Sequence, residues 1–92
     1  MADPLGASIT RNLCDRVYEK RKQGAGEVED LIKDLNANNQ KEQIVDIIDY
    51  LTQNYAASPN GNHRKGALIA LAAVAIALGT SVIIYFFIFL SY

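Results

Sequence analysis

Histidine and cysteine, the residues that most often supply metal ligands or nucleophiles, each occur once in this sequence, as His63 and Cys14. Structural zinc sites use four His or Cys ligands and catalytic sites use three protein ligands, so one His and one Cys alone cannot supply a zinc site. The sequence also contains no glycine-rich phosphate loop and no nucleophile elbow. We therefore expect no catalytic residues, no cofactor and no metal site, and we predict that the protein is not an enzyme.

Cys14 and the cations at residues 20–22 are the remaining side chains that could do chemistry. Cys14 lies on an apolar helical stripe, which favours a packed thiol over a reactive one. The cations could contact phosphoinositide headgroups, but three cations at a helix end are more often a solvated terminus. Asp46 and Asp49 share one helical face without a second acid across a cleft, so we read them as solvent-facing charges.

Charge is distributed very unevenly along the 92 residues. All nine Lys and Arg and all ten Asp and Glu lie at or before Lys65, whereas residues 67–92 contain none. The net charge of −1 gives no reason to expect a nucleic-acid surface, and the length allows one domain at most. Residues 1–4 lack the basic and apolar regions of a signal peptide, so a cytosolic setting is favoured.

Helical periodicity predicts three amphipathic helices in the charged region. Ser8 or Thr10 begins the first, which runs to about Arg21 and is followed by a chain loosened at Gly24 and Gly26. A second helix is expected from about Glu27 to the asparagines at 36, 38 and 39.

The third helix has the clearest pattern, and a fourth helix follows it. Apolar residues recur with the 3.6-residue period at Ile44, Ile47, Ile48, Leu51 and Tyr55. The turn at residues 58–61 closes the third helix, and the fourth begins around residue 62. Pairing the first helix with the second and the third with the fourth gives two antiparallel hairpins.

Three blocks of sequence carry a family resemblance. Residues 17–22 (VYEKRK), 27–29 (EVE) and above all 62–73 (NHRKGALIALAA) resemble, in order and spacing, the N-terminal end of the Vac fourteen family of vacuolar scaffold proteins. The resemblance extends over about residues 9–79. It departs at Gly24 and Gly26, where the family has better helix formers, and at Ala67 and Ala70, which replace glycines.

The resemblance implies a fold and a function. It implies an all-α segment of an α-solenoid, with about four helices in HEAT-like hairpins over residues 8–79, after a flexible N-terminus at residues 1–7. It also implies a non-catalytic scaffold that holds the PIKfyve lipid kinase and its associated phosphatase, supporting phosphatidylinositol 3,5-bisphosphate synthesis on the cytosolic face of endosome and vacuole membranes. The family's kinase-binding region begins near the fourth helix, so either partner contact or plain loop solvation explains the residues there. The candidate partner-binding residues are His63, Arg64, Lys65 and Gly66.

The C-terminal third departs most from the family. After Gly79 the family continues with polar residues and further repeats, whereas this chain continues with an apolar run. We interpret this as a truncated gene model or an alternatively spliced product. The alternative interpretation is a small tail-anchored membrane protein, because residues 67–90 are uncharged and long enough to span a bilayer core of about 30 Å. The candidate membrane-anchoring residues are Val82, Ile83, Ile84, Phe86, Phe87, Ile88, Phe89 and Leu90.

The apolar tail generates the first testable prediction. We expect the 92-residue chain to fractionate with membranes and to resist alkaline carbonate extraction, with Arg64 and Lys65 keeping the preceding region cytosolic. Truncation after Gly79 should release the protein, because the remaining run at residues 67–78 is too short for a span. Full-length protein in the soluble fraction, free of aggregates, would contradict the membrane anchor.

Overall fold

The computed structural model describes residues 3–79, 82–83 and 90–91 of the chain. The helices are α1 (Ala7–Leu13), α2 (Tyr18–Ala37), α3 (Lys41–Leu51) and α4 (Gly61–Leu78), and a π-helical segment η1 (Thr52–Ala56) extends α3. The described residues contain no strand. The predicted all-α fold is therefore confirmed.

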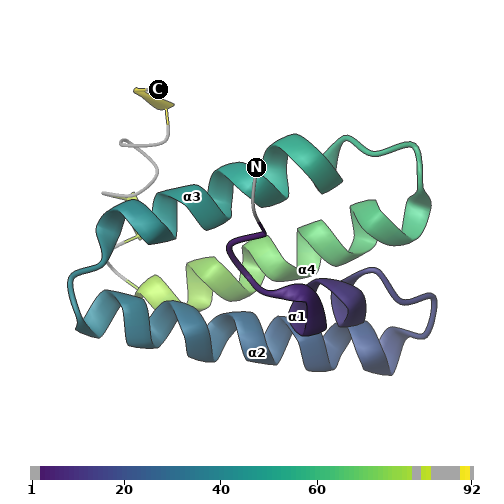
Figure 1. Cartoon of the computed structure of the whole chain (residues 1–92), viewed down its shortest axis with the longest axis horizontal. Helices are drawn as coiled ribbons and strands as arrows, with labels where there is room; N and C mark the ends of the chain where they lie inside the picture. The colour runs from purple at the N-terminus through teal and green to yellow at the C-terminus, as the bar shows by residue number, and fades with distance from the viewer. Residues whose placement is uncertain (1–2, 80–81, 84–89, 92) are drawn as a thin grey trace.

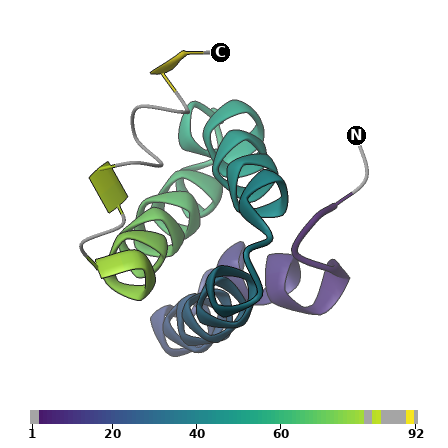
Figure 2. The same cartoon turned by 90° about the vertical axis from the view of Figure 1, so that its left-hand side faces the viewer.

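The three long helices form a bundle with α1 attached beside it. Figure 1 shows that α2 and α4 run in the same direction, while α3 runs in the opposite direction. Seen from the end, α2, α3 and α4 occupy the corners of a triangle, and α1 lies outside it (Figure 2). Each of α1 and α3 is thus antiparallel to the helix that follows it, and the two resulting hairpins meet where α2 packs along α4.

The core consists of the apolar stripes that the sequence predicted, together with the small residues of α4. The fully buried large side chains are Val28, Ile32, Ile44, Ile47 and Leu51. Against them α4 presents mostly small side chains, among which Ala70 and Val74 are almost fully buried. Small residues allow two helix backbones to approach closely, which compensates for the little apolar area that each alanine buries.

The predicted break at Gly24 and Gly26 is wrong, because both glycines lie inside α2. The chain turns earlier, between residues 14 and 17, where the Asp15 carboxylate accepts a hydrogen bond from the Val17 amide at 2.8 Å. A glycine inside a helix costs about 1 kcal/mol, which tertiary packing can offset. Val17, which falls inside the predicted first helix, is consequently 48% exposed in the turn.

Position 24 of α2 suits a glycine because Leu13, the last residue of α1, occupies the space that a larger side chain would need. A Cβ at Gly24 would lie 3.0 Å from the Leu13 nitrogen, and a Cβ at Gly66 of α4 would overlap the Leu13 carbonyl oxygen. Leu13 itself is 3% exposed. The end of α1 is therefore seated in a notch formed by one glycine from each of two helices, and we call this contact the Leu13 junction.

The N-terminal residues preceding α1 are packed against the bundle in the part that the structure describes. Leu5 is buried and belongs to the core. The two oxygens of Asp3 accept hydrogen bonds from the Leu5 amide at 2.9 Å and the Thr10 hydroxyl at 2.6 Å. Residues 3–7 of the predicted flexible segment are thereby held by one buried side chain and one carboxylate.

At its C-terminal end α4 stops at Leu78, and Gly79 follows with a positive φ of 55°, a conformation that favours glycine. Of the predicted anchor residues, Val82 packs partly against the core, and Ile83 and Leu90 are exposed. Ile84 and residues 86–89 lie outside the described residues. None of the helices in the described part of the chain combines the length and the apolar character that crossing a membrane requires.

The Leu13 junction generates a prediction about two glycines in helix interiors. Gly66→Ala should destabilise the protein by roughly 1–3 kcal/mol, because the added methyl group meets backbone atoms that cannot move independently. Gly26→Ala is the matched control, since a Cβ there meets nothing within 4 Å, and it should stabilise α2 by up to about 1 kcal/mol. Thermal unfolding followed by circular dichroism measures both changes. Equal melting temperatures for the two variants would contradict the junction.

Candidate functional site

The predicted partner-binding residues occupy the first turns of α4, and the cap of that helix sets their positions. The Asn60 side chain accepts hydrogen bonds from the backbone amides of Asn62 and His63, at 2.9 and 3.4 Å. Such a cap satisfies amides that have no partner within the helix and so fixes where α4 begins. The predicted start around residue 62 agrees with this boundary.

The four residues at 63–66 do not form one surface. His63 is half-buried, and Arg64 and Lys65 are exposed, whereas Gly66 is buried in the Leu13 junction. Arg64 folds back toward the preceding turn, where its Nη1 donates to the Ser58 carbonyl at 2.7 Å. Of the four, Lys65 has an exposed side chain for which no hydrogen bond or ion pair is found in the described structure.

His63 belongs to a small cluster of aromatic side chains. Its ring lies edge-on to Tyr55 with centroids 5.4 Å apart, and Tyr55 makes the same kind of contact with Tyr50 at 5.4 Å. The two tyrosine hydroxyls are 3.1 Å apart, within hydrogen-bond distance. Burial, and then this hydrogen bond, raise the pKa of Tyr55 well above its ordinary value. The π-helical segment matters here because it carries Tyr55, five residues after Tyr50.

Cys14 lies near this cluster, beside an enclosed space that it lines together with Tyr55 and His63. Burial raises the pKa of the Cys14 thiol, and the negative charge of Asp3 adds to the effect. A raised pKa leaves little thiolate at neutral pH, in agreement with the packed cysteine expected from the sequence. Within the described residues no three His, Cys, Asp or Glu side chains lie close enough together to hold a metal ion.

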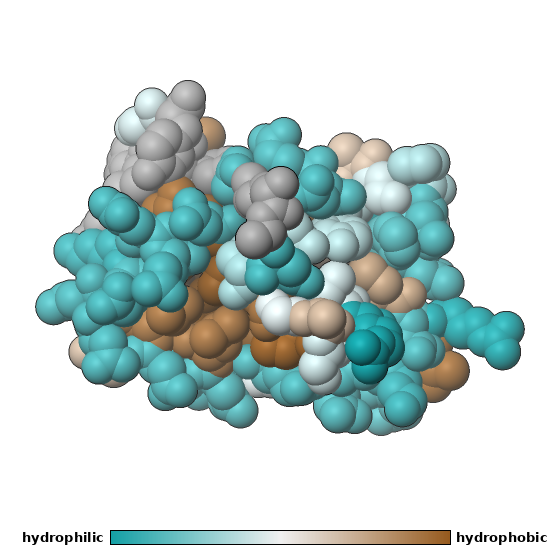
Figure 3. Space-filling model, viewed as in Figure 1, coloured by the Kyte–Doolittle hydropathy of each residue, from teal (hydrophilic) through white to brown (hydrophobic). Residues whose placement is uncertain are grey.

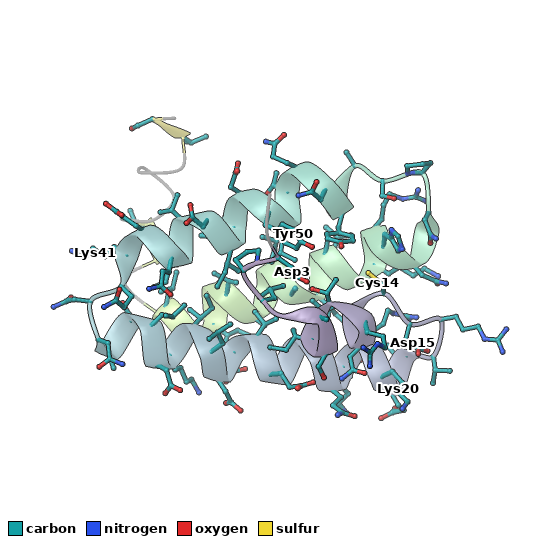
Figure 4. All side chains as sticks on the ribbon, in the orientation of Figure 1. Asp3, Cys14, Asp15, Lys20, Lys41 and Tyr50 are labelled. Carbon is teal, nitrogen blue, oxygen red and sulfur yellow. The ribbon has the colours of Figure 1, made fainter. Side chains whose placement is uncertain are left out.

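Two groups of cations that lie far apart in the sequence meet at one end of the bundle. Because α2 and α4 run in parallel, their N-termini lie at one end of the molecule (Figure 1). Figure 4 places Asp15 and Lys20 at this end and Lys41 at the opposite end. The cations of the first end are Arg16, Lys20, Arg21, Lys22, Arg64 and Lys65. We call it the basic end; only the tertiary structure brings its two sequence clusters together.

Arg21 departs most from the sequence prediction, which placed it among solvated cations at a helix terminus. It lies instead in the first turns of α2 and is only 8% exposed. Its Nη1 donates to the carbonyl oxygens of Asp15 and Arg16, both at 2.9 Å, and so holds the turn between α1 and α2. The guanidinium also lies 5.8 Å from the centre of the Tyr18 ring.

A surface groove between α2 and α4 is the feature that sequence reasoning missed. It is open to solvent at the basic end, and it is lined by Tyr18, Arg21, Lys65, Leu68, Ile69 and Ala72. The spacing of Tyr18 and Arg21, three residues apart, would have placed them on one helical face, had the start of α2 been recognised. Apolar surface is also visible between α2 and α3, on the side where the short α1 begins (Figure 3).

The described residues form an all-helical bundle that is distinguished by two parts of its surface, the basic end and the groove. Comparison with known proteins then shows which proteins the chain is similar to. A VAC14 homolog of Arabidopsis thaliana is 45% identical over 83 residues, which cover 87% of this chain. A VAC14 homolog of Schizosaccharomyces pombe is 40% identical over 80% of the chain. A Saccharomyces cerevisiae protein named Vacuole morphology and inheritance protein 14 is 44% identical over 78%.

The chain is thus homologous to a segment of the VAC14 proteins, and the resemblance seen in the sequence is confirmed. The matched residues make up 11%, 9% and 8% of the three relatives, so the chain spans about a tenth of their length. No family model matches the chain, and no solved structure matches it either. The name of the Saccharomyces cerevisiae relative refers to vacuole morphology and inheritance, and it names no enzymatic activity.

The tyrosine pair generates a prediction about alkaline stability. A raised pKa means that Tyr55 holds its proton more tightly in the folded than in the unfolded protein. Its contribution to the free energy of unfolding is therefore fully present below pH 10 and is lost as the pH rises above 10. At pH 7, Tyr55→Phe should cost about 1 kcal/mol through the lost hydrogen bond. Above pH 10 the difference in the free energy of unfolding between wild type and variant should become smaller. Urea unfolding from pH 7 to 11 measures this, and a difference that stays constant would contradict the assignment.

Proposed function

We propose that this chain is a segment of a HEAT-like, non-catalytic scaffold that holds the PIKfyve lipid kinase and its associated phosphatase together. In this role it supports phosphatidylinositol 3,5-bisphosphate synthesis on the cytosolic face of endosome and vacuole membranes. The observation that carries the proposal is the 45% identity to a VAC14 homolog over 83 residues. The vacuolar name of the Saccharomyces cerevisiae relative supports the location.

The arrangement of the helices supports a repeat scaffold. Two antiparallel hairpins lie next to each other with α2 and α4 in parallel, and stacked hairpins of this kind are the units of helical solenoids. Each unit of a solenoid buries its apolar face against a neighbour, so an isolated pair leaves apolar residues exposed. The apolar surface between α2 and α3 is available for such a neighbour (Figure 3).

A C-terminal membrane anchor remains a second candidate, carried by the uncharged run at residues 67–90. In the described structure, however, α4 buries Ala67, Ala70, Ala73, Val74 and Leu78 in the bundle. A span over residues 67–90 therefore requires α4 to leave the core. A span needs about 20 apolar residues, which the run from residue 82 to 90 alone does not provide.

Capture of the kinase tests the proposed scaffold function. We expect the immobilised 92-residue chain to co-precipitate PIKfyve, with at least about tenfold lower affinity than full-length VAC14, because repeat scaffolds spread recognition along many units. Failure to capture the kinase at any concentration would remove the function from this segment. Affinity equal to that of full-length VAC14 would show that the segment holds the complete binding surface.

A further inference from the structure

The groove between α2 and α4 has both cations and exposed apolar side chains in its lining. Packing of the two helices against each other does not require this combination. Its cations are Arg21 and Lys65, one from each helix. Its exposed apolar side chains include Tyr18 at 54% and Leu68 at 65%. A groove of this composition offers one site for an anionic group next to one for an apolar side chain.

Arg21 supplies the argument for the anion. It is 92% buried, since only 8% of its surface is exposed, and no carboxylate of the described residues lies within 4.0 Å of it. Its Nη1 is satisfied by two carbonyl oxygens, but its buried Nε has no hydrogen-bond partner in the described structure. Buried charges in proteins are normally paired, because an unpaired one loses its hydration without compensation. The lining of the groove thus contains an arginine that lacks its counter-charge.

The apolar surface next to this charge is elongated. On α4 the exposed positions at residues 68, 72, 75 and 76 are Leu, Ala, Ala and Ile, and their spacing places them on one helical stripe. At a rise of 1.5 Å per residue the stripe extends about 12 Å along the helix axis. An occupant that covers it must itself be elongated and apolar on one side, as an amphipathic helix is.

The recessed position of Arg21 favours a peptide over a membrane surface. A flat layer of anionic headgroups would meet the exposed cations of the basic end but reaches an 8% exposed guanidinium poorly. A single carboxylate side chain on a helix can enter the groove, and Lys65, exposed on its other side, adds attraction. Charge complementarity therefore identifies the occupant as an acidic segment of another protein.

We propose that the groove between α2 and α4 binds an amphipathic helix of a partner protein, with an acidic side chain between Arg21 and Lys65 and apolar side chains on Leu68 and Ala72. The inference rests on the proposed scaffold function, because it names the chemistry by which the segment would hold a partner. The helix lies along the two parallel helices, and its acidic end is at the basic end of the bundle.

A peptide titration with the full 92-residue chain tests the inference. The probe is a fluorescein-labelled 14-residue helical peptide with leucines along one face and two glutamates at one end, and a second peptide carries lysines in place of the glutamates. We expect the acidic peptide to bind in fluorescence anisotropy and the basic peptide not to bind. Amide shifts in NMR should fall on Tyr18, Lys65, Leu68 and Ala72.

Two charge reversals distinguish the groove from general electrostatic attraction. Lys65→Glu should weaken binding of the acidic peptide by about tenfold or more, because it reverses a charge next to the bound carboxylate. Lys41→Glu is the matched control, since Lys41 is an exposed lysine at the opposite end of the bundle, and it should leave the affinity unchanged. Circular dichroism verifies that both variants keep their helix content.

Several outcomes would overturn the inference. The first three are no binding of the acidic peptide, equal binding of both peptides, and equal effects of the two charge reversals. The fourth is Lys65-dependent binding to phosphatidylserine vesicles without peptide binding, and this result would assign the basic end to a lipid surface. The proposed function is judged separately. If the peptide binds but the kinase is not captured, the groove stands and the PIKfyve scaffold fails; if the kinase is captured without peptide binding, the reverse holds.

Discussion

The Leu13 junction is the contact on which the rest of the bundle depends. One leucine at the end of α1 fills a notch made by Gly24 of α2 and Gly66 of α4, so a single residue fixes three helices relative to one another. The approach of Leu13 leaves little or no room for a Cβ at either position, and both positions are glycine. The junction also explains why a glycine occupies position 24 inside α2, although glycine lowers intrinsic helix stability.

The same junction positions the surface on which the proposals rest. With α1 ending at Leu13, the chain must turn within a few residues to begin α2, and the Arg21 guanidinium is drawn inward to hold that turn through the carbonyls of Asp15 and Arg16. The buried charge that lines the groove is thus a consequence of how α1 ends. Arg21 therefore contributes both to packing of the turn and to the proposed recognition site. A partner's carboxylate would supply the counter-charge that the described part of the chain does not.

Parts of the candidate site could be read from the sequence, and others could not. The cap and first turn of α4 were predictable, because an asparagine in a turn-rich stretch precedes a long apolar run. Gly66 was predicted as a partner-binding residue, and the structure assigns it a packing role in the Leu13 junction. The groove was not predictable, since Tyr18 and Lys65 are 47 positions apart and periodicity reports only which residues share one helix. Arg21 was misplaced because glycines were given more weight than packing.

The sequence by itself determined the helical class, the core face of α3, the start of α4 and the relationship to the VAC14 proteins, because each of these depends on local periodicity, capping or residue identity. Only the tertiary structure decided where α2 begins, why its glycines are tolerated and which distant cations meet at the basic end. These features depend on contacts between segments far apart in the chain, where the burial of Leu13 and the parallel packing of α2 on α4 outweigh local helix propensity.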